Sequence, residues 1–91
     1  MTDRAADYAV AFSRQAWADY QHWVDNDPAT ARRLTRLIAD CLRHPTEGIG
    51  KPEPLKHDLA GCWSRRITKE HRLVYKVEGR RCLIVQCRYH Y

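Results

Sequence analysis

Residues 46–61 are rich in glycine and proline, and they divide the chain into halves with different apolar patterns. The segment contains Gly48, Gly50, Pro52, Pro54 and Gly61. Because glycine and proline at this density interrupt helices and strands, we predict a long loop without regular structure. Before the loop, apolar residues recur at helical spacing, whereas after it they alternate as in strands. These patterns predict an α+β fold with separate helical and strand layers.

The half of the chain before this loop predicts a short strand followed by a helix. Residues 8–12 form an apolar run typical of a strand, with Val10 and Phe12 on one face. Ser13 follows at the position expected for a helix N-cap. Residues 14–26 then carry an apolar stripe at spacings of three and four, formed by Ala16, Trp17, Tyr20, Trp23 and Val24.

A second helix is predicted from Pro28 to about His44. Asp27 supplies an N-cap carboxylate, Pro28 suits the first helical position, and Pro45 ends the helix. The buried stripe comprises Leu34, Leu37, Ile38, Cys41 and Leu42. The solvent side comprises Arg32, Arg33, Arg36 and Asp40. Because the joint between the helices is short, we expect an antiparallel helix hairpin.

Three strands are predicted after the loop, at residues 62–68, 72–77 and 81 to about 89. Turns at residues 69–71 and 78–80 join them, and consecutive strands with short turns pair antiparallel. Together with the N-terminal strand, they predict an antiparallel sheet of four or more strands. The helix hairpin should pack on one face of this sheet.

Side chains alternate across a strand, so the residues on each face of the sheet can be predicted. The face that meets the helices should carry Leu73, Tyr75, Val77, Leu83, Val85, Cys87 and Tyr89. The open face should carry Ile84 together with Arg66, Arg72, Lys76, Gln86, Arg88 and His90. Arg65 has the opposite parity to Arg66, so we expect it at a sheet edge or in an ion pair.

Size and charge narrow the classes of protein to which the chain can belong. The chain has 91 residues, which fits a single domain over residues 1–91, and we predict a flexible extension at residues 1–7. A net charge of +5 and a pI of about 9.3 favour a polyanionic partner, either nucleic acid or an acidic protein.

The cysteines and the N-terminal residues predict neither a metal site nor export. No two cysteines are spaced C-x-x-C, so we expect four reduced and mostly buried thiols. The N-terminal residues include Asp3, Arg4 and Asp7 and no apolar run, unlike a signal peptide. No stretch approaches the roughly 20 apolar residues that span a membrane. We therefore expect a cytoplasmic protein without a membrane partner.

The loop, the open face and the last residues together hold the groups needed to cleave RNA without a metal. RNA supplies its own nucleophile, the 2′-hydroxyl, so cleavage needs a base, phosphate-binding cations and an acid. Glu53, fixed between two prolines, is the candidate base, and His90 is the candidate acid. Arg66 and Arg72 are candidates for binding the phosphate, and Lys56 adds positive charge.

Each of these residues also has an ordinary structural explanation. Glu53 could be a solvated loop carboxylate, and His90 could belong to a frayed chain end. Arg66 and Arg72 could form cross-strand pairs on an open sheet. A basic loop without a function would explain Lys51, Lys56 and His57, and core or interface packing would explain Trp17, Trp23 and Trp63. The shared face of the arginines and His90 favours the functional interpretation.

Two segments carry a specific resemblance to a known family. Residues 51–75 read K-P-E-P-L-K-H-D-L-A-G-C-W-S-R-R-I-T-K-E-H-R-L-V-Y, and residues 87–91 read C-R-Y-H-Y. With the stripe of Trp17, Tyr20 and Trp23, they resemble the Txe/YoeB toxin family of the RelE/ParE superfamily. The resemblance covers the chain from Tyr8 onward and implies a RelE/ParE-like fold.

The resemblance implies a toxin of a type II toxin-antitoxin system that cuts mRNA codons in the ribosomal A site, without a metal or other cofactor. Its implied partners are the 70S ribosome with mRNA, a YefM-like antitoxin and a second copy of the chain. By position, it implies that Glu53 is the general base, Arg72 the phosphate-stabilising arginine and His90 the general acid. Supporting substrate-binding positions are Lys51, Lys56, Arg66 and Tyr91, and Glu70 corresponds to a structural carboxylate.

Two functions without catalysis stay open on the same fold. One is a ParE-like toxin that does not cut RNA, and the other is a module that binds the ribosome or nucleic acid. A general RNA-binding sheet would present aromatic side chains on its polar face. The predicted alternation instead puts Tyr75 and Tyr89 on the core face, which counts against a general RNA-binding sheet as a further alternative.

Overall fold

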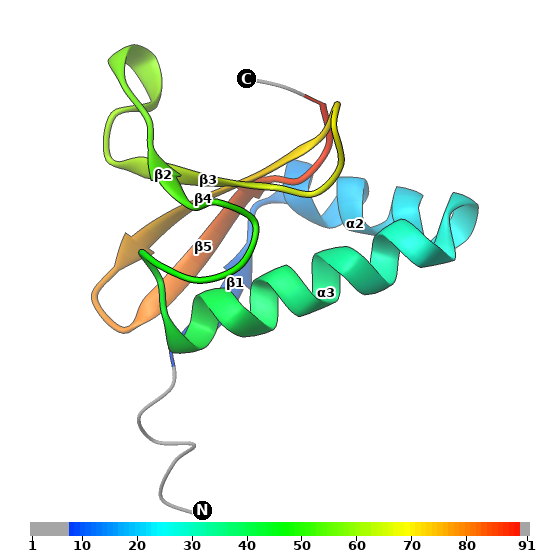
Figure 1. Ribbon diagram of the computed structural model, residues 1–91, viewed down its shortest axis with the longest axis horizontal. Coiled ribbons are helices and arrows are strands. Elements are labelled where there is room, and N and C mark those ends of the chain that lie inside the picture. Colours follow the sequence, from blue (N-terminus) through cyan, green and yellow to red (C-terminus); the bar gives the residue numbers. More distant parts are fainter. Residues whose placement is uncertain (1–7, 90–91) are drawn as a thin grey trace, which may run out of the picture.

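The computed structural model describes residues 8–89, and it confirms the α+β fold (Figure 1). Two helices and five strands follow one another as β1 Ala9–Phe12, α2 Arg14–Asn26, α3 Pro28–Arg43, β2 Glu53–Pro54, β3 Cys62–Arg66, β4 Arg72–Glu78 and β5 Arg81–Gln86. A short 3-10 helix, η1 His57–Leu59, lies between β2 and β3. Within residues 8–89, no helix is long and apolar enough to cross a membrane.

The strands form one sheet in the order β1-β5-β4-β3-β2. Strands β3, β4 and β5 pair antiparallel, as predicted, and β2 adds an antiparallel strand beside β3 that the sequence did not predict. The pairing of β1 with β5 is parallel, which corrects the expectation of a purely antiparallel sheet. A parallel pair needs a long crossover connection, and both helices and the three other strands lie between these two strands in the chain.

Side-chain caps fix the beginnings of both helices, as the sequence predicted. Ser13 Oγ accepts a hydrogen bond from the Ala16 amide at 3.0 Å and donates one to the Val85 carbonyl at 2.7 Å. Asp27 accepts from the amide and the hydroxyl of Thr30, at 3.1 and 2.8 Å. The hydrogen bonds from Thr30 lower the pKa of Asp27. Ser13 therefore starts α2 and ties it to β5 at the same time.

The core lies between the two helices and one face of the sheet (Figure 1). Helix α3 buries Leu34, Leu37, Ile38 and Cys41, as its apolar stripe predicted. Helix α2 differs from the prediction, because Trp17 and Val24 are half exposed and Asp19 is buried. All four cysteines are buried and free.

A β-bulge in β5 makes part of the predicted alternation wrong. Tyr75 pairs with Ile84, whereas Val74 pairs with Gln86, so Val85 is an extra residue in β5. Ile84 therefore lies in the core, contrary to the expectation, and Leu83 is half-buried on the other face beside Lys76. Beyond the bulge, Gln86 returns to the predicted open face.

The loop and the last strand also differ from their predicted extents. Glu53 and Pro54 form a two-residue strand at the edge of the sheet, where a proline is tolerated, and η1 follows, so the loop is not wholly irregular. Strand β5 ends at Gln86 instead of continuing to Tyr89. Tyr89 is 58% exposed and has a φ of 67°, so its predicted place on the core face is wrong.

Candidate active site

Four strands present one row of side chains on the face of the sheet away from the helices. Glu53 of β2 lies opposite Ser64 of β3. Ser64 lies opposite Val74 of β4, which lies opposite Gln86 of β5. Directly opposite residues point to the same face, and Ser64 and Val74 are buried outside the core cluster formed with the helices. Glu53 therefore shares the face predicted for the arginines.

The two candidate phosphate-binding arginines form the neighbouring cross-strand pair. Arg66 at the end of β3 lies opposite Arg72 at the start of β4, on the same face as Ser64 and Val74. Arg66 is exposed and Arg72 is partly buried. Adjacent strands lie about 4.8 Å apart and each residue advances a strand by about 3.3 Å, so Glu53 is roughly 12 Å from Arg72, two strands across and two residues along. Extended glutamate and arginine side chains can both contact one phosphodiester over such a span.

The turn after β3 holds the guanidinium group of Arg72. Its Nη1 donates hydrogen bonds to the carbonyls of Thr68, Lys69 and His71, at 2.9, 3.2 and 3.1 Å. Its backbone amide donates to the Tyr89 carbonyl at 3.1 Å. Arg72 thus has its side chain fixed on one side and holds the C-terminal segment with its backbone.

Residues 87–89 leave the sheet and are bound by side chains from α2 and from the turn just before β4. Asp19 accepts a hydrogen bond from the Cys87 amide at 3.0 Å, and Trp23 Nε1 donates to the Cys87 carbonyl at 2.8 Å. His71 Nδ1 accepts from the Tyr89 amide at 2.7 Å. The segment therefore ends beside Arg72. The two predicted site residues that follow, His90 and Tyr91, lie outside the described residues.

Three residues of this region have left-handed backbone conformations that are costly for side chains other than glycine. They are Lys51, His57 and Tyr89, with φ values of 52°, 58° and 67°. Lys51 precedes Glu53 by two residues, His57 follows Lys56, and Tyr89 precedes His90. Such strain, of about 1–3 kcal/mol each, gathers at functional sites. Both Lys51 and Lys56 are exposed on this loop.

A buried arginine anchors the loop that leads to Glu53. Arg65 is fully buried, and its Nη1 forms an ion pair with Asp40 at 2.6 Å, which confirms the ion-pair expectation but not an edge position. Its Nη2 donates to the carbonyls of His44 and Glu47 at 2.5 and 2.9 Å. Its Nη1 also bonds the Ile49 carbonyl. Asp40, predicted on the solvent side of α3, instead faces this arginine.

Backbone hydrogen bonds of Arg66 and Leu55 extend the anchoring of the loop toward β2. The Arg66 amide donates to the Gly50 carbonyl at 2.7 Å, and the Leu55 amide to the Cys62 carbonyl at 2.9 Å. A Cβ at Gly48 would collide with the Asp40 carboxylate, and its φ is 119°. Glycine is therefore required where the loop passes over the ion pair.

The structure thus brings Glu53, Arg66 and Arg72 onto one face, with Lys51 and Lys56 on the adjoining loop. Sequence reasoning missed the residues that hold the C-terminal segment. Asp19 had a signal, because it occupies a stripe position between Ala16 and Trp23, at spacings of three and four. Within residues 8–89, no group of three or more His, Cys, Asp or Glu side chains is placed to hold a metal ion.

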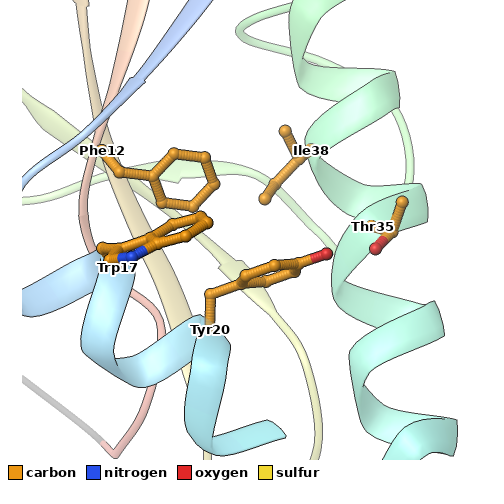
Figure 2. A pocket seen from close by; sticks show the side chains of 5 residues that line it. All are labelled: Phe12, Trp17, Tyr20, Thr35 and Ile38. Atoms are coloured by element: carbon orange, nitrogen blue, oxygen red, sulfur yellow. The ribbon is translucent and has the colours of Figure 1, made fainter. Parts of the chain in front are cut away.

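An apolar hollow of about 300 Å³ lies apart from these polar groups, among β1, α2 and α3. Figure 2 shows the rings of Phe12, Trp17 and Tyr20 facing Ile38 and Thr35 of α3. Trp17 stacks on Tyr20, and Phe12 meets Trp17 edge-on, both with ring centroids 5.7 Å apart. The aromatic lining offers no charged group for phosphate chemistry.

Sequence comparisons connect the chain with one family. Residues 12–91 match the family model described as the YoeB-like toxin of bacterial type II toxin-antitoxin systems. Toxin YoeB of Streptomyces coelicolor and Toxin YoeB of Escherichia coli K12 are each 54% identical over 82 residues, which is 90% of this chain and 98% of theirs. Toxin RelK of Mycobacterium tuberculosis is 51% identical over 83 residues, 91% of this chain and 98% of its own.

Solved structures of similar proteins share the fold. A YoeB/ParE toxin from Agrobacterium tumefaciens superposes with a TM-score of 0.87 at 45% identity, over 91% of this chain and 99% of that one. The Staphylococcus aureus YoeB dimer gives 0.86 at 44% identity, over 94% and 100%. A YoeB chain from the heterotetrameric Staphylococcus aureus YoeB-YefM complex gives 0.85 at 44%, over the same shares.

Proposed function

Because this chain belongs to the YoeB-like toxins of bacterial type II toxin-antitoxin systems, we propose that it is a ribosome-dependent endoribonuclease that cuts mRNA in the A site. The observation that carries the proposal is the shared face of Glu53, Arg66 and Arg72, beside the end of the C-terminal segment. A carboxylate, two guanidinium groups and a segment leading to an imidazole meet there. These groups match the needs of cleavage by the RNA's own 2′-hydroxyl.

In the proposed reaction, Glu53 removes the proton from the 2′-hydroxyl, whose oxygen attacks the adjacent phosphorus. Arg72 and Arg66 stabilise the negative charge that develops on the phosphoryl oxygens, because guanidinium groups match phosphate in geometry and charge. His90 donates a proton to the departing 5′-oxygen. The P–O bond to that oxygen breaks as the new bond forms, and the products carry a 2′,3′-cyclic phosphate and a 5′-hydroxyl.

Three further residues support the substrate in this proposal. Lys51 and Lys56 are exposed on the loop around β2, where they can bind neighbouring phosphates of the mRNA. Tyr91, which follows His90 in the sequence, is the third proposed substrate-binding residue. The scheme needs no metal, and its ribosomal substrate implies a cytoplasmic location.

The decisive experiment is primer extension on mRNA bound to purified ribosomes, with wild type, Glu53→Ala and His90→Gln. Asp25→Ala is the matched control, because Asp25 is an exposed carboxylate on α2. Wild type and control should give a stop within the A-site codon, and both site variants should lose it. Full cleavage by either variant would remove that residue from the mechanism.

Two additional measurements test the chemistry itself. End-group analysis should find cyclic phosphate and 5′-hydroxyl ends, whereas 5′-phosphate ends would indicate attack by water. Cleavage should also persist in EDTA on ribosomes stabilised by polyamines. If Glu53→Ala and His90→Gln stop translation as strongly as wild type, the chain blocks the ribosome without cutting, as a non-catalytic toxin would.

We also infer the protein partners from the relatives. The similar Staphylococcus aureus chains occur as a YoeB dimer and in a complex with YefM. We therefore propose that this chain binds a YefM-like antitoxin and forms a homodimer. Its net charge of +5 favours an acidic antitoxin segment. Light scattering after size-exclusion chromatography, alone and with an antitoxin from the neighbouring reading frame, would test both assemblies.

A further inference from the structure

The segment between β5 and His90 is held by an unusual set of hydrogen bonds. Once a chain leaves a sheet, its backbone groups need other partners. Here both the amide and the carbonyl of Cys87 are bound by α2 side chains, the carboxyl of Asp19 and the indole of Trp23. Two residues further on, the Tyr89 amide and carbonyl are bound by the His71 ring and the Arg72 amide.

Asp19 is only 5% exposed, although burial of a carboxyl group costs free energy unless it is fully hydrogen-bonded. Its second oxygen accepts a hydrogen bond from Gln15 Nε2 at 2.8 Å, so both oxygens are occupied. Burial, and then the nearby Asp19, raise the pKa of the Cys87 thiol to about 12. The thiol therefore stays protonated, and its Sγ lies 3.5 Å from the Ala16 carbonyl as a donor.

The His71 ring is fixed from two sides. It meets the Trp23 ring edge-on, with centroids 4.7 Å apart and planes at 81°. Because Nδ1 accepts from the Tyr89 amide, we assign the ring proton to Nε2. This bond holds Tyr89 in its left-handed conformation, with a φ of 67°. Tyr89 is the last residue that the structure describes, and these contacts fix its backbone.

We propose that Asp19, Trp23 and His71 form a tail clamp whose task is to position the general acid. The clamp fixes the backbone of residues 87–89 beside Arg72, and its proposed effect is to orient the residue that follows in the sequence, the general acid His90. The three residues are positioning residues, not catalytic ones, because they act through the backbone. This inference rests on the proposed ribonuclease function and adds residues to its mechanism.

Two substitutions of His71 separate positioning from packing. His71→Asn keeps an acceptor close to the place of Nδ1 and loses the ring. His71→Phe keeps a ring against Trp23 and loses the acceptor. If the clamp positions His90, His71→Phe should slow cleavage by about 100-fold, since small misplacements of catalytic groups have effects of that order. His71→Asn should stay within about fivefold of wild type.

Cleavage should be measured in single-turnover reactions with excess protein on ribosomes carrying mRNA, together with ribosome affinity and the thermal midpoint. The rate should follow the order wild type, His71→Asn, His71→Phe, while affinity stays unchanged. A faster reaction for His71→Phe than for His71→Asn, or equal losses in both, would show that only packing matters. Asp19→Asn and Asp19→Leu form a second pair of variants, because asparagine keeps an oxygen that can accept the hydrogen bond from the Cys87 amide and leucine does not.

A modified substrate tests whether the clamp acts through the acid. In an mRNA whose scissile 5′-oxygen is replaced by sulfur, the thiolate leaves without protonation. The loss caused by His71→Phe should then nearly disappear, as should the loss caused by His90→Gln. An equal loss on both substrates for His71→Phe alone would overturn the clamp but leave the mechanism intact. If unmodified mRNA is not cut by wild type, the proposed function itself fails.

Discussion

Arg65 and Arg66 are neighbours in the chain and have the same chemistry, yet they lie in opposite environments. Arg65 is fully buried and contacts Asp40, Tyr75 and backbone carbonyls. Arg66 is exposed on the other face of the sheet, opposite Arg72. Alternation along β3 separates them, so one residue step decides whether an arginine stabilises the fold or is available to a phosphate.

The buried arginine is tolerated because every part of its guanidinium group has a partner. A buried charge destabilises a protein unless it is paired and hydrogen-bonded. Burial lowers the pKa of Arg65, but the hydrogen bonds with Tyr75 and Asp40 outweigh that effect, and the net shift is upward. Burial also raises the pKa of Tyr75 to about 12, so its hydroxyl stays neutral and donates to the Pro45 carbonyl.

The largest difference between the two arginines should appear in activity. If Arg66 binds the phosphate as proposed, Arg66→Ala should slow single-turnover cleavage by about 100-fold, since it removes a cation that would stabilise the developing charge. Arg66→Lys should recover part of the rate, because the charge remains and the fork geometry is lost. Equal rates for Arg66→Ala and wild type would exclude Arg66 from phosphate binding.

The second difference concerns stability. Arg65→Met should lower the free energy of unfolding by about 3–5 kcal/mol, because it leaves Asp40 and several carbonyls without their partner. Arg66→Met should change it by less than about 0.5 kcal/mol, as expected for an exposed side chain. Urea denaturation of both variants provides the measurement. Similar unfolding free energies for the two variants would contradict the anchoring role of Arg65.

A smaller effect is expected where the loop crosses the buried ion pair. Gly48→Ala should destabilise the protein by about 2–3 kcal/mol, because its Cβ meets the Asp40 carboxylate and its φ of 119° is unfavourable. Gly79→Ala is the matched control, since its φ is 60° and nothing lies near its Cβ. The control should cost about 1 kcal/mol. If both variants lower the thermal midpoint equally, Gly48 matters only for its positive φ and not for the contact with Asp40.

The smallest effect should appear in the stability of the protein at acidic pH. Burial raises the pKa of Asp40, but hydrogen bonds from Arg65 and the Ile49 amide, together with the charges of Arg65 and His44, outweigh this, so the pKa lies below the ordinary 3.8. A lowered folded pKa stabilises the native state above the unfolded pKa, and this stabilisation is lost as the pH falls through the folded value. Unfolding free energy should therefore drop below about pH 4, by less than about 1.4 kcal/mol per pH unit. Asp40→Asn should weaken this dependence of the unfolding free energy on pH. If the dependence is unchanged, other carboxyl groups cause it.

The sequence predicted the arginine face because β3 and β4 are regular, and simple alternation holds in both. It failed in β5, where the extra residue Val85 reverses the alternation and no glycine or proline marks the bulge. Strand β2 was also missed, because a strand of two residues that follows Pro52 and contains Pro54 carries no periodic pattern. Strand β2 forms only because it pairs with β3, and no pattern within residues 53–54 themselves indicates this pairing.

The candidate site was predictable to the extent that its residues lie on regular strands or in a recognisable segment. Glu53, Arg66 and Arg72 were identified in this way. The clamp was not, because an aspartate on a helix usually indicates a solvated face. Only the tertiary structure shows that Asp19 meets Cys87, 68 residues away in the chain.

The parallel pairing of β1 with β5 has a consequence for the order of folding during synthesis. The hydrogen bond between Ser13 and Val85 joins residues 72 positions apart, so the first strand has no partner until nearly the whole chain has been made. Domains form as their segments emerge from the N-terminus onward. The helices can associate early, but the sheet closes last and the candidate site with it. If the proposed function is correct, a nascent chain should therefore be inactive until its synthesis is nearly complete.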